Sequence, residues 1–254
     1  MARTPRSSAR RSLGVLAGLA VAIAVVCAVA IWRPWATDPT PVSRADAGGA
    51  QAVAVPAIDL PDDPRVLVFG DSWTFGSAAS VATLGYAYVL GDLLGGETIV
   101  NGSRGSGYLV PGIDGGTFGE RIADLDPALD PDLVIVQGSI NDRKVPAEGY
   151  TDAVSSAWDA LSATYPNTPI VILGPAPQVL PVEPATARID RDLSAAATAR
   201  GWAYISPIAD GWITAADYDW IIDTGEIGRN HPTTEGHAYL AERVAEALSA
   251  LRAR

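Results

Sequence analysis

Cysteine is almost absent from this 254-residue sequence, in which Cys27 stands alone. A single thiol cannot form an intrachain disulfide, so no disulfide framework is available to organise the fold. Cys27 lies inside an apolar run, and Val25 and Val26 before it are larger than the small residues that precede a lipidated cysteine. We therefore interpret Cys27 as a small apolar packing residue.

Histidine is nearly as scarce, and the common motifs of metal and nucleotide sites are missing. The two histidines are His231 and His237, and their spacing does not match the i, i+4 pair of a zinc-binding helix. No G-x-G-x-x-G follows a strand-like run, and no P-loop lysine motif is present. The sequence therefore predicts neither a metal ion nor a cofactor.

Basic residues are few in the main body of the chain. The formal net charge is -11 at pH 7, and residues 61–254 carry 12 Lys or Arg against 26 Asp or Glu. Such a surface repels phosphate backbones, so no nucleic acid partner is expected. A neutral or cationic substrate fits this overall charge better than an anionic one.

The N-terminal region contains the one long uncharged stretch. Residues 1–12 are rich in arginine, and residues 13–31 form an uncharged apolar run of 19 residues, which as a helix crosses about 30 Å of hydrocarbon. The arginines favour the cytoplasm, so this run predicts a single-pass membrane anchor with the rest of the chain outside. The alternative is a cleaved signal peptide, with Ala28 and Ala30 at a small-x-small site, which gives a secreted protein.

Composition and periodicity divide residues 32–254 into a linker and a domain. Residues 32–64 are rich in Pro, Ala, Gly and Asp without periodicity, which indicates a flexible linker. In residues 65–254, continuous apolar runs alternate with segments of helical spacing, which predicts an α/β domain of three layers, doubly wound around a mostly parallel five-stranded sheet. The expected strands are 65–69, 98–100, 132–136, 169–173 and 202–206, and the expected helices are 81–94, 150–165, 182–200 and 235–251.

Ser72 stands at the point where the first strand gives way to a helix. The run Gly70-Asp71-Ser72 ends that strand, and a serine on so sharp a turn can present its hydroxyl clear of the backbone. Serine needs a base to act as a nucleophile, and histidine is the usual one. His231 lies in the loop before the last helix and is the candidate base, whereas His237 lies within that helix and is interpreted as a packing residue.

Two further loops follow strands and offer hydrogen-bond donors. The loop 101–108 is rich in glycine, and the loop 138–142 contains Asn141. Backbone N–H groups and a side-chain amide are the donors that an acyl-transfer oxyanion requires. Each loop alone would be an ordinary turn or helix cap, but both are expected at the edge of the sheet that carries Ser72.

Together the four loops resemble the SGNH hydrolases, also called GDSL esterases and lipases, over residues 65–250. The resemblance implies the flavodoxin-like SGNH hydrolase fold, with Ser72 as nucleophile and His231 as base. It also implies an oxyanion hole made by the backbone N–H of Ser72, the backbone N–H of Gly105 and the side chain of Asn141. In that loop, Gly107 is nearly as good a match as Gly105.

One position departs from the family pattern. The family has an aspartate three residues before the histidine, where this sequence has Gly228. Asp223 or Glu226 from the preceding loop could orient the imidazole instead, or a backbone carbonyl could do so in a Ser-His dyad.

The implied function is hydrolysis of carboxylic esters through an acyl-serine intermediate, outside the cytoplasm. Lipid esters and O-acetyl sugar esters, including those of polysaccharides, are the expected substrates. The alternatives are a weakly active or inactive surface-binding module on the same fold, and an acyltransferase. Nothing in the sequence predicts an oligomeric state.

Overall fold

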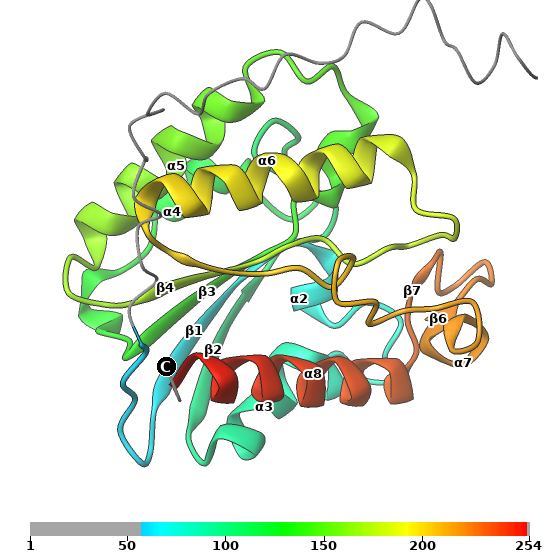
Figure 1. Ribbon diagram of the computed structural model, residues 1–254, viewed down its shortest axis with the longest axis horizontal. Helices are drawn as coiled ribbons and strands as arrows, with labels where there is room; N and C mark the ends of the chain where they lie inside the picture. Colours follow the sequence, from blue (N-terminus) through cyan, green and yellow to red (C-terminus); the bar gives the residue numbers. More distant parts are fainter. Residues whose placement is uncertain (1–56, 253–254) are drawn as a thin grey trace, which may run out of the picture. The chain divides into compact units, whose positions relative to one another are not determined.

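The computed structural model describes residues 57–252, which fall in one compact unit of the chain (Figure 1). The predicted basic segment 1–12, the predicted membrane span 13–31 and most of the predicted linker lie outside the described residues. Among residues 57–252, no helix combines the length and the apolarity that crossing a bilayer requires.

Five parallel strands form the central sheet, in the order β2-β1-β3-β4-β5. Placing β1 inside the sheet, with β2 on one side and the later strands on the other, creates a change of direction at which ligands bind in such folds. The expected α/β fold with a five-stranded sheet is therefore confirmed, and this sheet is parallel throughout. The strands are Arg65–Gly70 (β1), Glu97–Gly102 (β2), Leu133–Gln137 (β3), Ile170–Leu173 (β4) and Ala203–Ile205 (β5).

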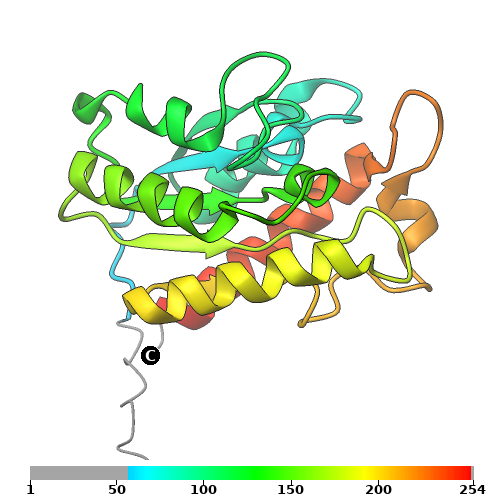
Figure 2. The same cartoon turned by 90° about the horizontal axis from the view of Figure 1, so that it is seen from above.

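Helices cover both faces of the sheet, as a doubly wound fold requires. In Figure 1, α3 and α8 lie on one side and α4, α5 and α6 on the other, and Figure 2 shows the long α6 running along the outer side of the layer. Alternate side chains of each strand enter one of two buried clusters, which explains the continuous apolar runs in the sequence. The helices are Tyr86–Leu94 (α3), Phe118–Ala123 (α4), Tyr150–Thr164 (α5), Pro184–Arg200 (α6) and Thr234–Arg252 (α8).

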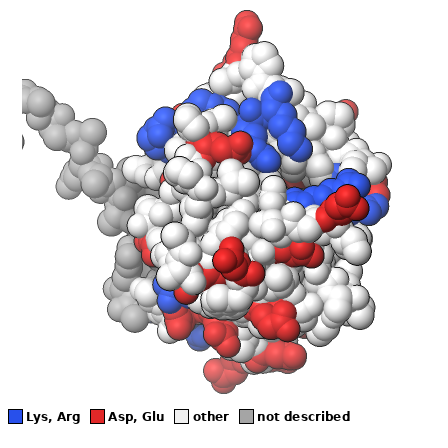
Figure 3. Space-filling model, turned by 90° about the vertical axis from the view of Figure 1, so that its right-hand side faces the viewer, with Lys and Arg blue, Asp and Glu red and all other residues white. Residues whose placement is uncertain are grey.

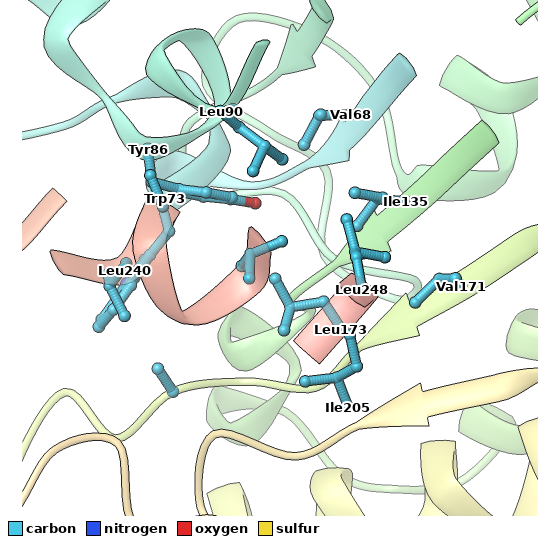
Figure 4. Packing of buried hydrophobic residues seen from close by; sticks show 14 of the residues in the cluster. Val68, Trp73, Tyr86, Leu90, Ile135, Val171, Leu173, Ile205, Leu240 and Leu248 are labelled. Atoms are coloured by element: carbon cyan, nitrogen blue, oxygen red, sulfur yellow. The ribbon is translucent and has the colours of Figure 1, made fainter. Parts of the chain in front are cut away.

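The cluster beneath α3 and α8 reaches the region of the predicted site through Trp73. In Figure 4, Trp73 and Tyr86 lie near Leu240 of α8, on the same side of the sheet as Val68 and Leu90. Trp73 directly follows Ser72, so its burial fixes the turn on which Ser72 stands.

Two of the predicted boundaries are wrong. The helix expected over 81–94 is interrupted, because Gly85 separates a short 3-10 turn, Ala82–Leu84, from α3. A side chain at Gly85 would collide with the backbone of Gly76, so this close approach ends the first turn. The linker also stops before residue 64, since Ile58 and Leu60 are buried in the core and Ile58 N donates to Leu251 O at 3.2 Å.

Several short elements are not anticipated from the sequence. They are the four-residue helix Ser72–Phe75 (α2), the 3-10 helix Ile140–Lys144, the helix Tyr218–Ile221 (α7) and the antiparallel pair Ile222–Asp223 (β6) and His231–Pro232 (β7). All are too short to produce a periodic pattern, and most of them lie near Ser72 or His231 in the chain.

Candidate active site

The loops that follow the strands meet at a cleft beyond the carboxyl edge of the sheet. The cleft has a volume of about 720 Å³ and is lined by Ser72, Gly105, Asn141 and His231, among others. These four residues come from four separate loops, so the structure brings together the site residues that the sequence pattern singled out. Asp223, the candidate orienting acid, lies on β6 and is not among the residues that line the cleft.

Ser72 is the first residue of α2 and is held on a tightly fixed turn. The preceding residue, Asp71, caps the helix by accepting a hydrogen bond from Trp73 N at 2.9 Å. The Ser72 side chain opens onto the cleft although only 6% of the residue is exposed. Its hydroxyl Oγ lies 2.8 Å from Nε2 of His231, at hydrogen-bond distance.

His231 is oriented by the main chain. Its Nδ1 lies 2.7 Å from the carbonyl oxygen of Gly228. A carbonyl only accepts, so Nδ1 carries the proton and donates it, which leaves the Nε2 lone pair facing the Ser72 hydroxyl. This is the tautomer that a general base needs.

The environment lowers the pKa of His231. Burial is the main cause, and the positive charges of Lys144 and Arg143 act in the same direction, whereas backbone hydrogen bonds at Gly228 and Arg229 oppose them. The imidazole is therefore neutral, and able to accept a proton, at lower pH than an exposed histidine would be.

The carboxylate of Asp223 occupies the space that a side chain at position 228 would need. A Cβ on Gly228 would overlap Cγ of Asp223. The carboxylate itself accepts a hydrogen bond from Gly225 N at 2.8 Å, and no carboxylate of the described residues, including Glu226, is hydrogen bonded to the His231 ring. Of the three orienting groups left open by the sequence, the carbonyl is the one in contact with Nδ1.

The turn between β6 and β7 is shaped to deliver that carbonyl. Arg229 and Asn230 both have left-handed backbone conformations, with φ of 51° and 62°, which cost energy for residues other than glycine. Asn230 N donates to Asp223 O at 2.8 Å and closes the turn. The backbone thus folds back so that Gly228 O faces the ring of His231.

Asn141 and Gly105 come from the other two loops that line the cleft. Asn141 Nδ2 donates one hydrogen bond to Ser106 O at 3.0 Å, and its Oδ1 accepts from Lys144 Nζ at 3.3 Å. The second amide hydrogen has no acceptor among the described residues. Gly105 has a φ of 78°, whereas the N–H of Gly107 is used within its own loop, donating to Val110 O at 2.8 Å.

Comparison with known proteins gives the same family as the loops. The family model described as "GDSL-like Lipase/Acylhydrolase family" matches residues 68–239. The chain belongs to this family of ester-hydrolysing serine hydrolases. A GDSL lipase of Mycobacterium tuberculosis is 31% identical over 149 residues, which is 57% of this chain and 61% of that protein, so the match spans less than two thirds of the relative.

Solved structures share the fold of this GDSL domain at low sequence identity. The native aryl esterase of Mycobacterium smegmatis has a TM-score of 0.55 at 19% identity, covering 74% of this chain and 99% of that one. A carbohydrate acetylesterase family member from Sinorhizobium meliloti has a TM-score of 0.55 at 16% identity, covering 75% and 100%.

Asp142 ties two loops of the GDSL domain together, a role that the sequence pattern does not reveal. Its carboxylate accepts backbone hydrogen bonds from Tyr108, Leu109 and Val110 at 2.7, 2.9 and 3.1 Å. Burial raises the pKa of this carboxyl, and the three N–H donors oppose that rise. Through Asp142, the loop that carries Gly105 is fixed relative to Asn141. The Asn-Asp pair is visible in the sequence, but the partners are long-range.

Arg121 of α4 links the segment that leads to Ser72 with the loop that carries Gly105. Its guanidinium donates to Gly70 O at 3.0 Å and to Ser106 Oγ at 2.9 Å, and it stacks over the ring of Phe69. Burial lowers its pKa to about 10.

The nearby Asp71 has its pKa raised to about 7, mainly by burial. The only sequence signal for α4 is its capping box, Thr117 with Glu120.

His237 is a packing residue in the structure, as interpreted from the sequence. It is fully buried, Nδ1 accepts a hydrogen bond from Tyr86 N at 3.2 Å, and Nε2 donates to Ser77 O at 3.0 Å. Burial lowers its pKa to about 4. Among the described residues, no group of three or more His, Cys, Asp or Glu side chains is placed to hold a metal ion.

Proposed function

We propose that this chain is a serine esterase that hydrolyses carboxylic esters through an acyl-serine intermediate, with Ser72 as nucleophile and His231 as base. The observation that carries the proposal is the chain of contacts Ser72 Oγ to His231 Nε2 at 2.8 Å and His231 Nδ1 to Gly228 O at 2.7 Å, at the wall of an open cleft. Nucleophile, base and orienting group are already within hydrogen-bond reach of one another.

The first half-reaction acylates Ser72. As Oγ attacks the ester carbonyl carbon, Nε2 of His231 takes the hydroxyl proton, and the carbonyl oxygen becomes an oxyanion. The backbone N–H groups of Ser72 and Gly105 and the second amide hydrogen of Asn141 donate to that oxygen. When the intermediate collapses, the alcohol leaves with the proton from Nε2, and the acyl group stays on Oγ.

The second half-reaction returns the enzyme to its starting state. A water molecule gives a proton to Nε2 while its oxygen attacks the acyl carbon, and the carboxylic acid leaves as Oγ recovers the proton. A sugar hydroxyl in the place of water would give acyl transfer, so product analysis with an added sugar acceptor distinguishes hydrolase from transferase.

The Gly228 carbonyl replaces the orienting function of a third acidic residue but not its full charge. In the serine-protease template, changing the acid to its amide costs about 10⁴ in turnover because the histidine adopts the wrong tautomer. Here the carbonyl enforces the correct tautomer. The imidazolium that forms during reaction is stabilised by a dipole instead of a full negative charge, so we expect an active enzyme of moderate rate.

Lipid esters and O-acetyl sugar esters are the proposed substrates, and the proposed location is outside the cytoplasm. The structural similarity to a carbohydrate acetylesterase family member is compatible with O-acetyl sugar esters. The location is supported by the arginine-rich residues 1–12 and the apolar residues 13–31, which predict an anchored domain, or a secreted one if that segment is cleaved.

The test is hydrolysis of p-nitrophenyl acetate, butyrate and octanoate by the full chain. Ser72→Ala removes the nucleophile, and Ser80→Ala is the matched control, because Ser80 is exposed near the cleft without lining it. We expect turnover by the wild type and by Ser80→Ala but not by Ser72→Ala. A folded wild-type chain without Ser72-dependent turnover on any ester would favour the surface-binding alternative and overturn the proposal.

A further inference from the structure

The active-site cleft is basic in a protein that is acidic as a whole. Four of the residues that line it are cationic and one is acidic: Arg104, Arg143, Lys144 and Arg229, against Glu226. Figure 3 views the face that carries β6, β7 and the carboxyl ends of the strands. Lys and Arg gather in its upper half, whereas its lower half carries mainly Asp and Glu. Four of the 12 Lys and Arg residues of segment 61–254 therefore line the cleft that contains Ser72 and His231.

Two of the four cations already have carboxylate partners. Arg104 donates two hydrogen bonds to Asp114, at 2.7 and 2.6 Å, and Arg143 pairs with Glu183 at 2.9 Å. These ion pairs leave little charge for a ligand. Their effect is to hold the two side chains in fixed positions at the cleft wall.

Lys144 and Arg229 have no such partner. Within residues 57–252, neither forms a salt bridge. Arg229 Nε donates only to the backbone oxygen of Glu226 at 3.3 Å, and Lys144 Nζ contacts only Asn141 Oδ1. Burial and the charge of Arg143 lower the pKa of Lys144. Both side chains are exposed at the edge of the cleft, where a cation without a counter-charge attracts an anion.

The position of Lys144 sets where that anion would lie. Lys144 contacts the same amide that is placed to donate to the oxyanion, and its charge reaches His231, whose pKa it lowers. Arg229 is two residues before His231 and lines the same cleft. The two free cations thus flank the reacting atoms from the Asn141 side and from the His231 side.

We propose that the substrate of this site is an ester with an anionic group, a carboxylate, sulfate or phosphate, close to its scissile bond. This inference rests on the proposed esterase function and specifies its substrate class. It reverses the expectation from the overall charge that a neutral or cationic substrate fits better, because local charge in a cleft outweighs a diffuse surface charge that salt screens.

Acetate esters of phenols whose para substituents differ in charge test the inference on the full chain. Methyl 4-acetoxybenzoate is neutral, 4-acetoxybenzoate is anionic and 4-acetoxyphenyltrimethylammonium is cationic. Release of the phenol is followed, and each kcat/KM is divided by the ester's own rate of reaction with water, an uncharged nucleophile. A second pair, 4-nitrophenyl hydrogen adipate and its methyl ester, places the charge on the acyl side. We expect at least one anionic ester to be preferred over its neutral partner by about fivefold or more, and less so in 0.5 M salt.

Variants separate substrate binding from other roles of these cations. Lys144→Gln and Arg229→Gln should each lower the ratio of anionic to neutral kcat/KM by about two- to fivefold. Arg191→Gln is the matched control, because Arg191 is exposed on α6, does not line the cleft and loses the same charge. If Lys144 only orients Asn141, both esters will lose rate equally and the ratio will not change.

The outcomes distinguish this inference from the proposed function. Ser72-dependent turnover with no anionic preference, or with ratios unchanged in Lys144→Gln and Arg229→Gln, overturns the charge preference and leaves the esterase standing. No Ser72-dependent turnover on any of the esters overturns the esterase and the charge preference together.

Discussion

The turn that holds the nucleophile and the turn that holds the base are built in different ways. Ser72 stands on a turn whose neighbours Asp71 and Trp73 are buried, with side chains that cap the helix and enter the core. His231 follows a more exposed turn, is oriented by the main chain of Gly228, and depends on two residues in left-handed conformations. The nucleophile side is therefore fixed by packing, and the base side by backbone geometry.

This difference separates two ways in which a catalytic group can be positioned. A side chain locked by a buried shell resists small changes of sequence nearby. A group held by the conformation of a loop depends on the residues that tolerate this conformation. We expect substitutions on the base side to change rate while leaving stability almost unchanged.

The largest effect is expected for His231→Ala. Without a base, kcat should fall by about 10⁴ or more, and the temperature of unfolding should stay close to that of the wild type because His231 is only partly buried. Turnover of p-nitrophenyl acetate and thermal unfolding of the same preparation give both values. A loss of less than about tenfold would mean that another group acts as base.

Asn141→Ala should have the next largest effect. Removing one oxyanion donor costs about 10² to 10³ in kcat. The loss should appear in kcat more than in KM, because the hydrogen bond strengthens as the oxyanion forms. Steady-state kinetics check this split, and an effect confined to KM would contradict the role assigned to the amide.

His237 gives an expected effect on stability instead of rate. Its folded pKa of about 4 lies below the ordinary 6.5. The contribution of His237 to the free energy of unfolding is therefore fully present above pH 6.5. It falls as the pH drops through 4, by about 3 kcal/mol in total. Asp71, whose pKa is raised to about 7, acts in the opposite direction over this range, since its unfolded form ionises first as pH rises.

Wild type and His237→Gln are accordingly compared by urea unfolding at each pH from 4 to 8. Subtracting the two curves cancels the contribution of Asp71. The difference in the free energy of unfolding should shrink as pH falls through this window. A difference that stays constant with pH would show that His237 does not titrate as expected.

The smallest effect is expected for Asp223→Asn. If Gly228 O orients the imidazole, kcat should change by no more than about threefold, against about 10⁴ for an orienting acid.

Gly228→Asp should impair the enzyme because its side chain would overlap Asp223. Pairing it with Asp223→Gly frees that space, and kinetics of the three variants show whether a carboxylate here improves on the carbonyl. Substantial inactivation by Asp223→Asn would instead identify Asp223 as the third member of a Ser-His-Asp triad with Ser72 and His231.

The sequence predicts the nucleophile side of the site better than the base side, for a physical reason. Ser72 follows a strand with a clear apolar run, and the Gly70 and Asp71 before it indicate a sharp turn at the end of that strand. The contact between Gly228 O and His231 depends on φ angles at Arg229 and Asn230, which no residue pattern announces. Asp223 is a candidate from the sequence, but its place in the space beside position 228 depends on the path of the turn.

The fold shows the same division between local and long-range causes. The five strands and the four longer helices have apolar periods, which predict them nearly to their ends, except that α3 begins at Tyr86 instead of residue 81. The short elements α2, α7, β6 and β7 have none. The role of Asp142 is not predicted because its hydrogen-bond partners are far away in the chain. The basic cleft is not predicted because its residues come from separate loops, and the composition of the whole protein predicts an acidic surface.

A base that is oriented by a peptide carbonyl has a consequence for how this protein varies. Every amino acid supplies that same oxygen, so no substitution at position 228 can remove the group that contacts Nδ1. Saturation mutagenesis at this position would measure how well each side chain fits beside Asp223. It would not measure what the Gly228 carbonyl contributes to orienting His231. Replacing the amide that follows Gly228 with an ester weakens the acceptor, and it also removes the Arg229 N–H that donates to Gly225 O at 2.9 Å. An ester in place of the amide that follows Gly225, which weakens only the acceptor of that second bond, is the control that isolates the contribution of Gly228 O.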